Sequence, residues 1–171
     1  MRLLIDGRSG SGKTELANAI HELTGAQLVH MDQLYPGWNG LEAGSLAVRR
    51  LLETGRWRAW DWTTSSPGEW HEVDLGGPLI VEGCGALSRA NRELADYGVW
   101  VGLDDATRKA RALARDGEEY APHWDDWAAQ EWTFIRRELP IALADELVDG
   151  HDVTRDVERW RGIVDPARVD G

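Results

Sequence analysis

Close to its N-terminus the chain reads Leu3-Leu4-Ile5-Asp6-Gly7-Arg8-Ser9-Gly10-Ser11-Gly12-Lys13-Thr14. From Gly7 to Thr14 this segment fits the phosphate-loop pattern G-x-x-x-x-G-K-[ST] without a mismatch. The residues before the loop are apolar, as in a buried strand, and Leu16, Ile20 and Leu23 recur after it at helical spacing. The segment therefore predicts a strand, a phosphate-binding loop and a helix in direct succession.

The glycines and the lysine of this loop determine its chemistry. Glycine lets the backbone curl so that successive N–H groups face a phosphate, and the following helix adds its positive dipole end. Lys13 can then reach the β- and γ-phosphates, while the Thr14 hydroxyl can ligate Mg²⁺. A glycine-rich turn without a ligand is the alternative. We expect ATP and Mg²⁺ as cofactors, with the nucleotide bound by Gly7, Ser9, Gly10, Ser11, Gly12, Lys13 and Thr14.

The composition restricts the class of protein. The 171 residues are of single-domain length, and no run approaches about 18 consecutive apolar residues, so no membrane span is expected. A formal net charge of −11 disfavours nucleic acid as a partner, because gripping a phosphate backbone requires a basic surface. The early position of the loop, which leaves no room for a signal peptide, and the single cysteine, Cys84, lead us to expect a cytoplasmic protein.

Short apolar runs alternate with helix-like segments along the chain. The runs are 2–5, 27–31, 79–82, 98–103 and 146–149, and the helix-like segments are 13–23, 41–54, 86–95, 105–115, 125–138 and 154–160. Such alternation is typical of a parallel sheet covered by helices on both faces. We therefore expect an α/β fold of three layers around a five-stranded parallel sheet. Asn39 with Glu42 is expected to cap the second helix, and Asp104 or Asp105 the fourth.

Two segments, 55–77 and 116–127, interrupt this alternation. Insertions of this kind lie beside the ligand crevice of a parallel sheet. The chain has ten tryptophans, and several fall in these segments or next to them. They either fill the core and the helix contacts or line a pocket for a flat or ring-shaped substrate.

Two carboxylates follow expected strands. Asp32 ends the second strand and Glu82 the third, and the carboxyl ends of parallel strands face one crevice. Asp32 can accept a proton from an attacking hydroxyl or hold Mg²⁺ through water, and Glu82 can support the metal. The alternatives are that Asp32 caps a turn and that Glu82 is an ordinary strand-end residue.

Three arginines, Arg108, Arg111 and Arg115, share one face of the fourth expected helix because they are spaced at i, i+3 and i+7. Guanidinium groups this close repel each other unless an anion lies between them, and arginine suits phosphoryl oxygens in a transition state. A solvated face with salt bridges to acidic residues is the alternative. Beside a phosphate loop, the stripe favours a catalytic role.

Four segments in this order resemble the uridine kinase and phosphoribulokinase family of P-loop kinases, most closely the uridine–cytidine kinases. They are 5–14, Asp32-Gln33-Leu34-Tyr35, Trp60-Asp61-Trp62 with Val81-Glu82-Gly83, and Asp105-Ala106-Thr107-Arg108-Lys109-Ala110-Arg111-Ala112-Leu113-Ala114-Arg115-Asp116. The resemblance implies a three-layer P-loop NTPase fold and a single kinase domain over 1–171. It also implies an arginine-bearing lid near 108–127, an acceptor-side insertion near 33–77, and Asp32 as the catalytic base.

The match is weaker where the acceptor should bind. The family lid continues with further arginines, whereas this chain has Gly117-Glu118-Glu119-Tyr120. No aspartate follows Tyr35 to hold a ribose diol, and Thr63-Thr64-Ser65-Ser66 stand where basic and imidazole groups are expected. We expect the substrate to contact Asp32, Tyr35, Trp38, Trp60, Trp62 and Glu82.

These features predict an ATP- and Mg²⁺-dependent kinase that transfers the γ-phosphoryl group to a hydroxyl of a small molecule, with a nucleoside as the leading acceptor. The first alternative is a kinase of a sugar, a sugar acid or another small metabolite, because tryptophan faces pack well on sugar rings. The second is a nucleotide-binding regulatory module without phosphotransfer. The expected partners are ATP and the acceptor, and a homo-oligomer is left open.

Overall fold

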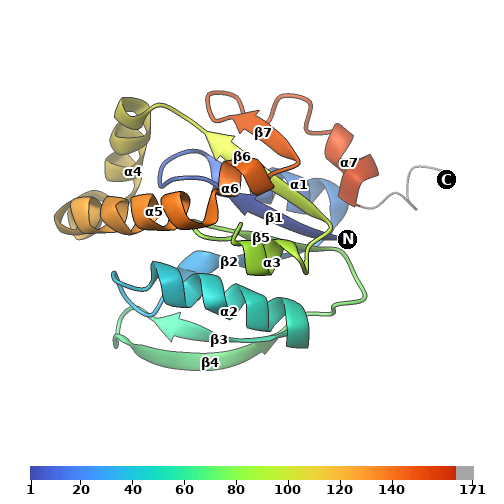
Figure 1. Ribbon diagram of the computed structural model, residues 1–171, viewed down its shortest axis with the longest axis horizontal. Coiled ribbons are helices and arrows are strands. Elements are labelled where there is room, and N and C mark those ends of the chain that lie inside the picture. The colour runs from blue at the N-terminus through green and yellow to red at the C-terminus, as the bar shows by residue number, and fades with distance from the viewer. Residues whose placement is uncertain (165–171) are drawn as a thin grey trace.

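The computed structural model describes residues 1–164, apart from the side chains of Asp116 and Glu118 (Figure 1). Its centre is a five-stranded sheet in the order β2-β5-β1-β6-β7, in which all neighbours run parallel. The strands are β1 (Arg2–Asp6), β2 (Gln27–His30), β5 (Leu79–Glu82), β6 (Tyr97–Gly102) and β7 (Glu146–Asp149). The expected sheet is confirmed, and each strand begins and ends within one residue of its predicted bounds.

Helices cover both faces of this sheet (Figure 1). One face carries α1 (Lys13–Thr24) and α7 (Arg159–Val164), and the other carries α2 (Leu41–Thr54), α3 (Arg89–Arg92) and α5 (Trp124–Glu138). The alternation of side chains along β1 makes this division, because Leu3 and Ile5 pack with the α1 cluster whereas Leu4 packs with the α2 cluster. All three leucine and isoleucine side chains are fully buried. The three layers are therefore held by apolar burial on both sides of one sheet.

The remaining helical elements are η1 (Met31–Gln33), α4 (Asp105–Tyr120), η2 (Ala121–His123) and α6 (Pro140–Leu143). In Figure 1, α4 and the start of α5 extend past the sheet at the left of the view. Gly117, with a φ of 56° and a ψ of −136°, breaks α4 before its last residues. Within residues 1–164, no helix combines the length and the apolar character that crossing a membrane requires.

Two expected helices are shorter or later than predicted. The segment 86–95 forms only α3, because the Asp6 carboxylate accepts hydrogen bonds from the backbone N–H groups of Gly85 and Leu87 and holds a loop there. α7 begins at Arg159, not at 154, because Asp156 has a φ of 58° and the preceding residues form turns. The shorter α3 and the later start of α7 both result from local backbone conformation, which the spacing of apolar residues does not predict.

One of the two expected caps is confirmed. The Asp104 carboxylate accepts a hydrogen bond from the N–H of Thr107 at 2.9 Å and caps α4. The Asn39–Glu42 cap is wrong: Gly40 precedes α2, and Glu42 instead pairs with Arg137 of α5 at 2.5 Å. The first N–H of α2, that of Leu41, donates to the Gln130 side chain at 3.3 Å. Gln130 of α5 thus caps the start of α2, a role that the sequence assigns to Asn39 and Glu42.

The insertion at 55–77 contains an antiparallel hairpin of β3 (Arg56–Asp61) and β4 (Ser66–Glu72). The hairpin lies on the side of α2 that faces away from the central sheet (Figure 1). Its Trp57 is 7% exposed and stacks on the His71 ring with centroids 4.5 Å apart. The sequence does not predict these strands, because most of their other side chains are exposed and the segment lacks an apolar run.

Candidate functional site

The phosphate loop joins β1 to α1, as predicted. Gly10 has a φ of 80°, and a Cβ at this position would lie 2.2 Å from the carbonyl oxygen of Arg108. The first turn of α4 is thus packed against the loop and leaves no room for a side chain there. Gly12, with a φ of 102°, directly precedes α1, so the positive end of the α1 dipole lies at the loop.

A glutamate of α5 anchors this loop from outside. Glu131 is 3% exposed and accepts hydrogen bonds from the Ser9 backbone N–H at 2.6 Å and from Arg8 Nε at 2.8 Å. Arg8 also donates Nη1 to Asp105 of α4 at 3.1 Å. The sequence pattern does not single out Arg8 or Glu131 as site residues. Glu131 falls on the same face of α5 as the buried Trp124, Trp127 and Phe134, and a charged residue on such an apolar face indicates a buried partner.

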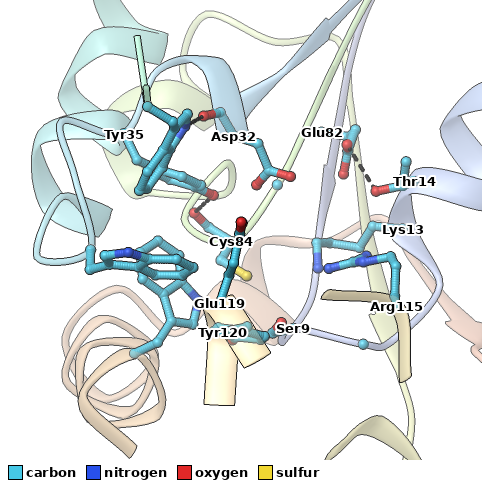
Figure 2. Close-up of a pocket in the computed structure, with 15 residues that line it drawn as sticks. Ser9, Lys13, Thr14, Asp32, Tyr35, Glu82, Cys84, Arg115, Glu119 and Tyr120 are labelled. Atoms are coloured by element: carbon cyan, nitrogen blue, oxygen red, sulfur yellow. Dashed lines mark hydrogen bonds between the residues drawn. The ribbon is translucent and has the colours of Figure 1, made fainter. Parts of the chain in front are cut away.

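Lys13 is the buried cation of the site. Its side chain is 7% exposed, and Nζ donates to the Arg8 carbonyl at 3.1 Å. Burial lowers the pKa of Lys13, but neighbouring acidic groups, Glu82 and Glu131 among them, raise it by more, so its pKa lies above the ordinary value. Lys13 is therefore a fixed positive charge at neutral pH, and Figure 2 shows it beside Arg115.

Thr14 and Glu82 meet where the strands end. The Thr14 hydroxyl donates to Glu82 Oε1 at 3.1 Å, and His30 Nδ1 lies 2.6 Å from the same oxygen. His30 and Glu82 are register partners on neighbouring strands, which explains their contact. The hydrogen bond with Glu82 raises the pKa of His30. The sequence pattern does not single out His30, although its place two residues before Asp32 puts it at the same edge of the sheet.

These residues fit a Mg²⁺ ion. The ion prefers oxygen ligands and is usually held by one or two carboxylates together with substrate phosphates and water. The Thr14 hydroxyl and the Glu82 carboxylate are oxygen donors already in contact beside the loop. Asp32 adds a third oxygen donor, since Figure 2 shows its carboxylate directed into the same cavity.

The cavity in front of the loop has a volume of about 510 Å³ (Figure 2). Its lining residues are Ser9, Gly10, Lys13, Thr14, Asp32, Tyr35, Trp38, Trp62, Glu82, Gly83, Cys84, Arg115, Glu119, Tyr120 and Trp127. We divide the lining residues into two ends and name each end after the ligand that the sequence leads us to expect there. The phosphate end holds Lys13, Thr14 and Arg115, and the acceptor end holds the five aromatic rings with Asp32 and Glu119.

Specific contacts fix the aromatic side chains of the acceptor end. The Trp62 Nε1–H donates to the Asp32 carbonyl at 2.8 Å, which ties the hairpin turn to η1. The Tyr35 hydroxyl donates to the Cys84 carbonyl at 2.8 Å. Trp38 stacks on Tyr120 with centroids 5.4 Å apart. Trp38, Trp62 and Tyr35 thus line the cavity as expected from the sequence, whereas Trp60 does not line it.

A second cavity, of about 600 Å³, adjoins the first on the α1 side of the loop. The two cavities share Gly10, Lys13, Thr14 and Arg115. The second cavity is completed by Gly12, Glu15, Asn18, Ala19, Glu22, Arg111 and Thr154. The shared wall therefore consists of Gly10, Lys13 and Thr14 from the glycine-rich loop and the start of α1, together with Arg115 from α4.

The three arginines occupy different environments. Arg108 is 2% exposed and donates to the Ser9 carbonyl at 2.9 Å, so in this structure it packs under the loop and lines neither cavity. Arg111 donates to the Gly150 carbonyl at 2.7 Å and borders the second cavity. Arg115 borders both cavities. The helix spacing places the stripe on one face, but burial separates its members.

Two further acidic groups lie beside the loop. Asp6 is 1% exposed, and burial raises its pKa to about 6, against the opposing effect of hydrogen bonds from Leu87, Gly7 and Gly85. Burial also raises the pKa of the Cys84 thiol, whose Sγ donates to Glu131 at 3.4 Å. A thiol held protonated in this way is not a nucleophile at neutral pH.

The comparisons with known proteins agree on the fold. No protein-family model and no curated protein matches the chain. A "possible uridine kinase" of Bacillus stearothermophilus superposes with a TM-score of 0.59 at 20% identity, covering 87% of this chain and 88% of that one. The shikimate kinase of Acinetobacter baumannii, solved with shikimate, gives 0.54 at 15% identity over 98% and 94%. A gluconokinase of Sinorhizobium meliloti 1021 gives 0.51 at 17% identity over 99% and 97%.

These similarities span nearly complete chains at low sequence identity and therefore concern the fold. The α/β, three-layer P-loop fold expected from the sequence is confirmed, and this chain shares it with small-molecule kinases.

Proposed function

We propose that the chain is an ATP- and Mg²⁺-dependent kinase that phosphorylates a hydroxyl group of a small molecule. The observation that carries this proposal is the pair of cavities that meet at Lys13, Thr14 and Arg115. A nucleoside triphosphate in the second cavity would present its γ-phosphate to a hydroxyl compound in the first. We treat 1–171 as one catalytic domain, with a lid near 108–127 and an acceptor-side insertion near 33–77.

In the proposed reaction, the acceptor hydroxyl oxygen forms a bond to the γ-phosphorus while the bond to the bridging oxygen of ADP breaks. The Asp32 carboxylate takes the hydroxyl proton. The loop N–H groups and Lys13 hold the phosphates, and Arg115 neutralises charge on the transferred group. Arg111 borders the donor side, and Arg108 acts on the loop through the Ser9 carbonyl. Mg²⁺ held by Thr14 and Glu82 would supply charge neutralisation between the phosphates.

A nucleoside is the first acceptor that we propose, because four segments of the chain resemble the uridine kinase family and one structural neighbour is described as a possible uridine kinase. A sugar or another hydroxyl metabolite is the second, since rigid tryptophans border the acceptor end. A regulatory module that only binds nucleotide does not require a second cavity with a carboxylate and aromatic rings beside the loop. The function therefore favoured is group transfer.

The test is ADP release from ATP and Mg²⁺ with a panel of nucleosides, sugars and other hydroxyl compounds. Asp32→Asn should lower acceptor-dependent turnover by about 10²–10³-fold while the nucleotide Kd stays unchanged. Asp125→Asn, a matched change at an exposed position of α5 outside both cavities, should leave turnover unchanged. Full turnover by Asp32→Asn would contradict the assigned base. Nucleotide binding without acceptor-dependent ADP release across the panel would favour the regulatory module.

A further inference from the structure

We propose that the acceptor is a hydroxyl-bearing ring compound that also carries a protonated amine and no acidic group. This inference rests on the proposed kinase function and narrows its acceptor to one charge class. It follows from the charges and rings that line the acceptor end of the cavity.

The charges in the cavity are divided between its two ends. Among the described residues that line it, the cations are Lys13 and Arg115, and both belong to the phosphate end. Of the three lining carboxylates, Glu82 contacts Thr14, whereas Asp32 and Glu119 belong to the acceptor end, and Figure 2 shows both of these carboxylates directed into the cavity. Lys13 and Arg115 would be occupied by nucleotide phosphates. An acidic acceptor would therefore face two carboxylates without a cation to pair with.

The charge of Glu119 should make a cationic acceptor bind more tightly than a neutral one. Asp32 is used as the base, so a neutral nucleoside or sugar gives Glu119 nothing of opposite charge. Bringing an uncharged ligand against a carboxylate removes water from that charge at a cost, whereas an ammonium group both replaces the water and neutralises the charge. The formal net charge of −11 favours a cationic acceptor in the same way, since the whole molecule attracts cations and repels anions.

The aromatic rings of the acceptor end are an independent reason to expect a cationic ring compound. Tyr35, Trp38, Trp62, Tyr120 and Trp127 line the acceptor end. Trp38 also stacks on His123, with centroids 4.4 Å apart and planes 11° from parallel. Rings fixed by such contacts present the surface that remains open to the cavity with little loss of side-chain entropy when a ring compound binds. Their negative π faces attract an organic cation, and attract it more strongly when water is excluded.

The test compares compounds that differ mainly in charge. Three series are used: phenylalaninol, 3-phenylpropan-1-ol and 3-phenyllactate; glucosamine, glucose and glucuronate; and 5-aminoallyluridine, uridine and 5-carboxyuridine. Binding is measured by quenching of tryptophan fluorescence with Mg²⁺ and a non-hydrolysable ATP analogue present, so that the phosphate end is filled. In the series that binds most tightly, the amine should have a Kd about tenfold below that of its neutral partner, and the acid should bind most weakly.

Glu119→Gln should remove most of the advantage of the amine without changing the Kd of the ATP analogue. Glu69→Gln is the matched control, because Glu69 is exposed on β4 and lines neither cavity. The proposal is overturned if a neutral or acidic compound binds most tightly, or if Glu119→Gln leaves the ranking unchanged. Failure of every amine to bind at about 10 mM also overturns it, because a carboxylate among ring faces should hold an ammonium at that concentration.

ADP release from ATP with the same compounds separates this proposal from the proposed function. If the amines bind but no compound is phosphorylated, the kinase assignment fails and the charge class stands. If only a neutral or acidic compound is phosphorylated, the kinase assignment stands and the charge class fails.

Discussion

The phosphate end and the acceptor end of one cavity are built in opposite ways. The phosphate end comes largely from consecutive residues in the loop between β1 and α1 and at the start of α1, and its main groups are backbone N–H donors, Lys13 and Thr14. The acceptor end combines side chains from η1 and the loop after it, the hairpin turn, α4 and α5, which are far apart in the sequence. The first depends on local backbone geometry, and the second on how separate elements pack. Changes at the two ends should therefore affect different steps of the reaction.

The largest effect is expected at the phosphate end. Lys13→Ala should lower turnover by about 10³-fold, because it removes a preorganised positive charge where the transferred phosphoryl group gains negative charge. The measurement is ADP release at saturating acceptor, with the thermal melt as a check on folding. Lys109→Ala, at the other lysine of the chain and exposed on α4, serves as the control. Retained turnover in Lys13→Ala would remove the basis for the donor site.

The next effect concerns stability beneath the same loop. Burial raises the pKa of Asp6 to about 6, so the folded protein holds this proton more tightly than the unfolded chain, where the value is near 3.8. The stability that protonated Asp6 contributes is present below pH 4 and is lost as the pH rises through 6, to a total of about 3 kcal/mol.

The measurement is urea unfolding of wild type and Asp6→Asn at pH 4 and pH 7. The free energy of unfolding of wild type, relative to Asp6→Asn, should be higher at pH 4. A difference that does not change with pH would show that Asp6 is not the titrating group.

A smaller effect is expected where α5 anchors the loop. Glu131→Gln keeps the size of the side chain but removes its charge, so the hydrogen bonds from Ser9 and Arg8 weaken by about 1–2 kcal/mol. The KM for ATP should rise by about tenfold, with a smaller change in the acceptor KM. Steady-state kinetics with each substrate varied in turn decide the matter. Equal rises in both KM values would indicate a general loss of structure.

The smallest effect should belong to the acceptor end alone. Trp62→Ala removes a lining ring and the hydrogen bond to the Asp32 carbonyl, so the acceptor KM should rise by about five- to tenfold while the KM for ATP stays constant. Trp70→Ala is the control on the same hairpin, because Trp70 is 53% exposed and does not line the cavity. A rise in the KM for ATP with Trp62→Ala would mean that the two ends are not separable.

The sequence predicts the phosphate end almost completely and the acceptor end only in part. The loop, the five strands and the positions of Asp32 and Glu82 follow from short-range patterns, since apolar runs and glycine spacing act over a few residues. Of the four aromatic residues expected to contact the substrate, Tyr35, Trp38 and Trp62 line the cavity, whereas Trp60 does not. Glu119, Tyr120 and Trp127 were not assigned to the site, because their place depends on the break at Gly117 and on the packing of α4 and α5.

The sequence alone did not determine which polar side chains are buried against residues distant in the chain. By itself it determined the P-loop, the succession of strands and helices along the chain and a helix face with three arginines, because each of these depends on covalent spacing and local conformation. Only the tertiary structure decided that Arg108 packs under the loop, that Glu131 holds the loop from α5 and that the hairpin turn reaches Asp32. Each of these contacts joins residues at least 30 positions apart, and it exists only once the apolar faces of the elements have excluded water between them.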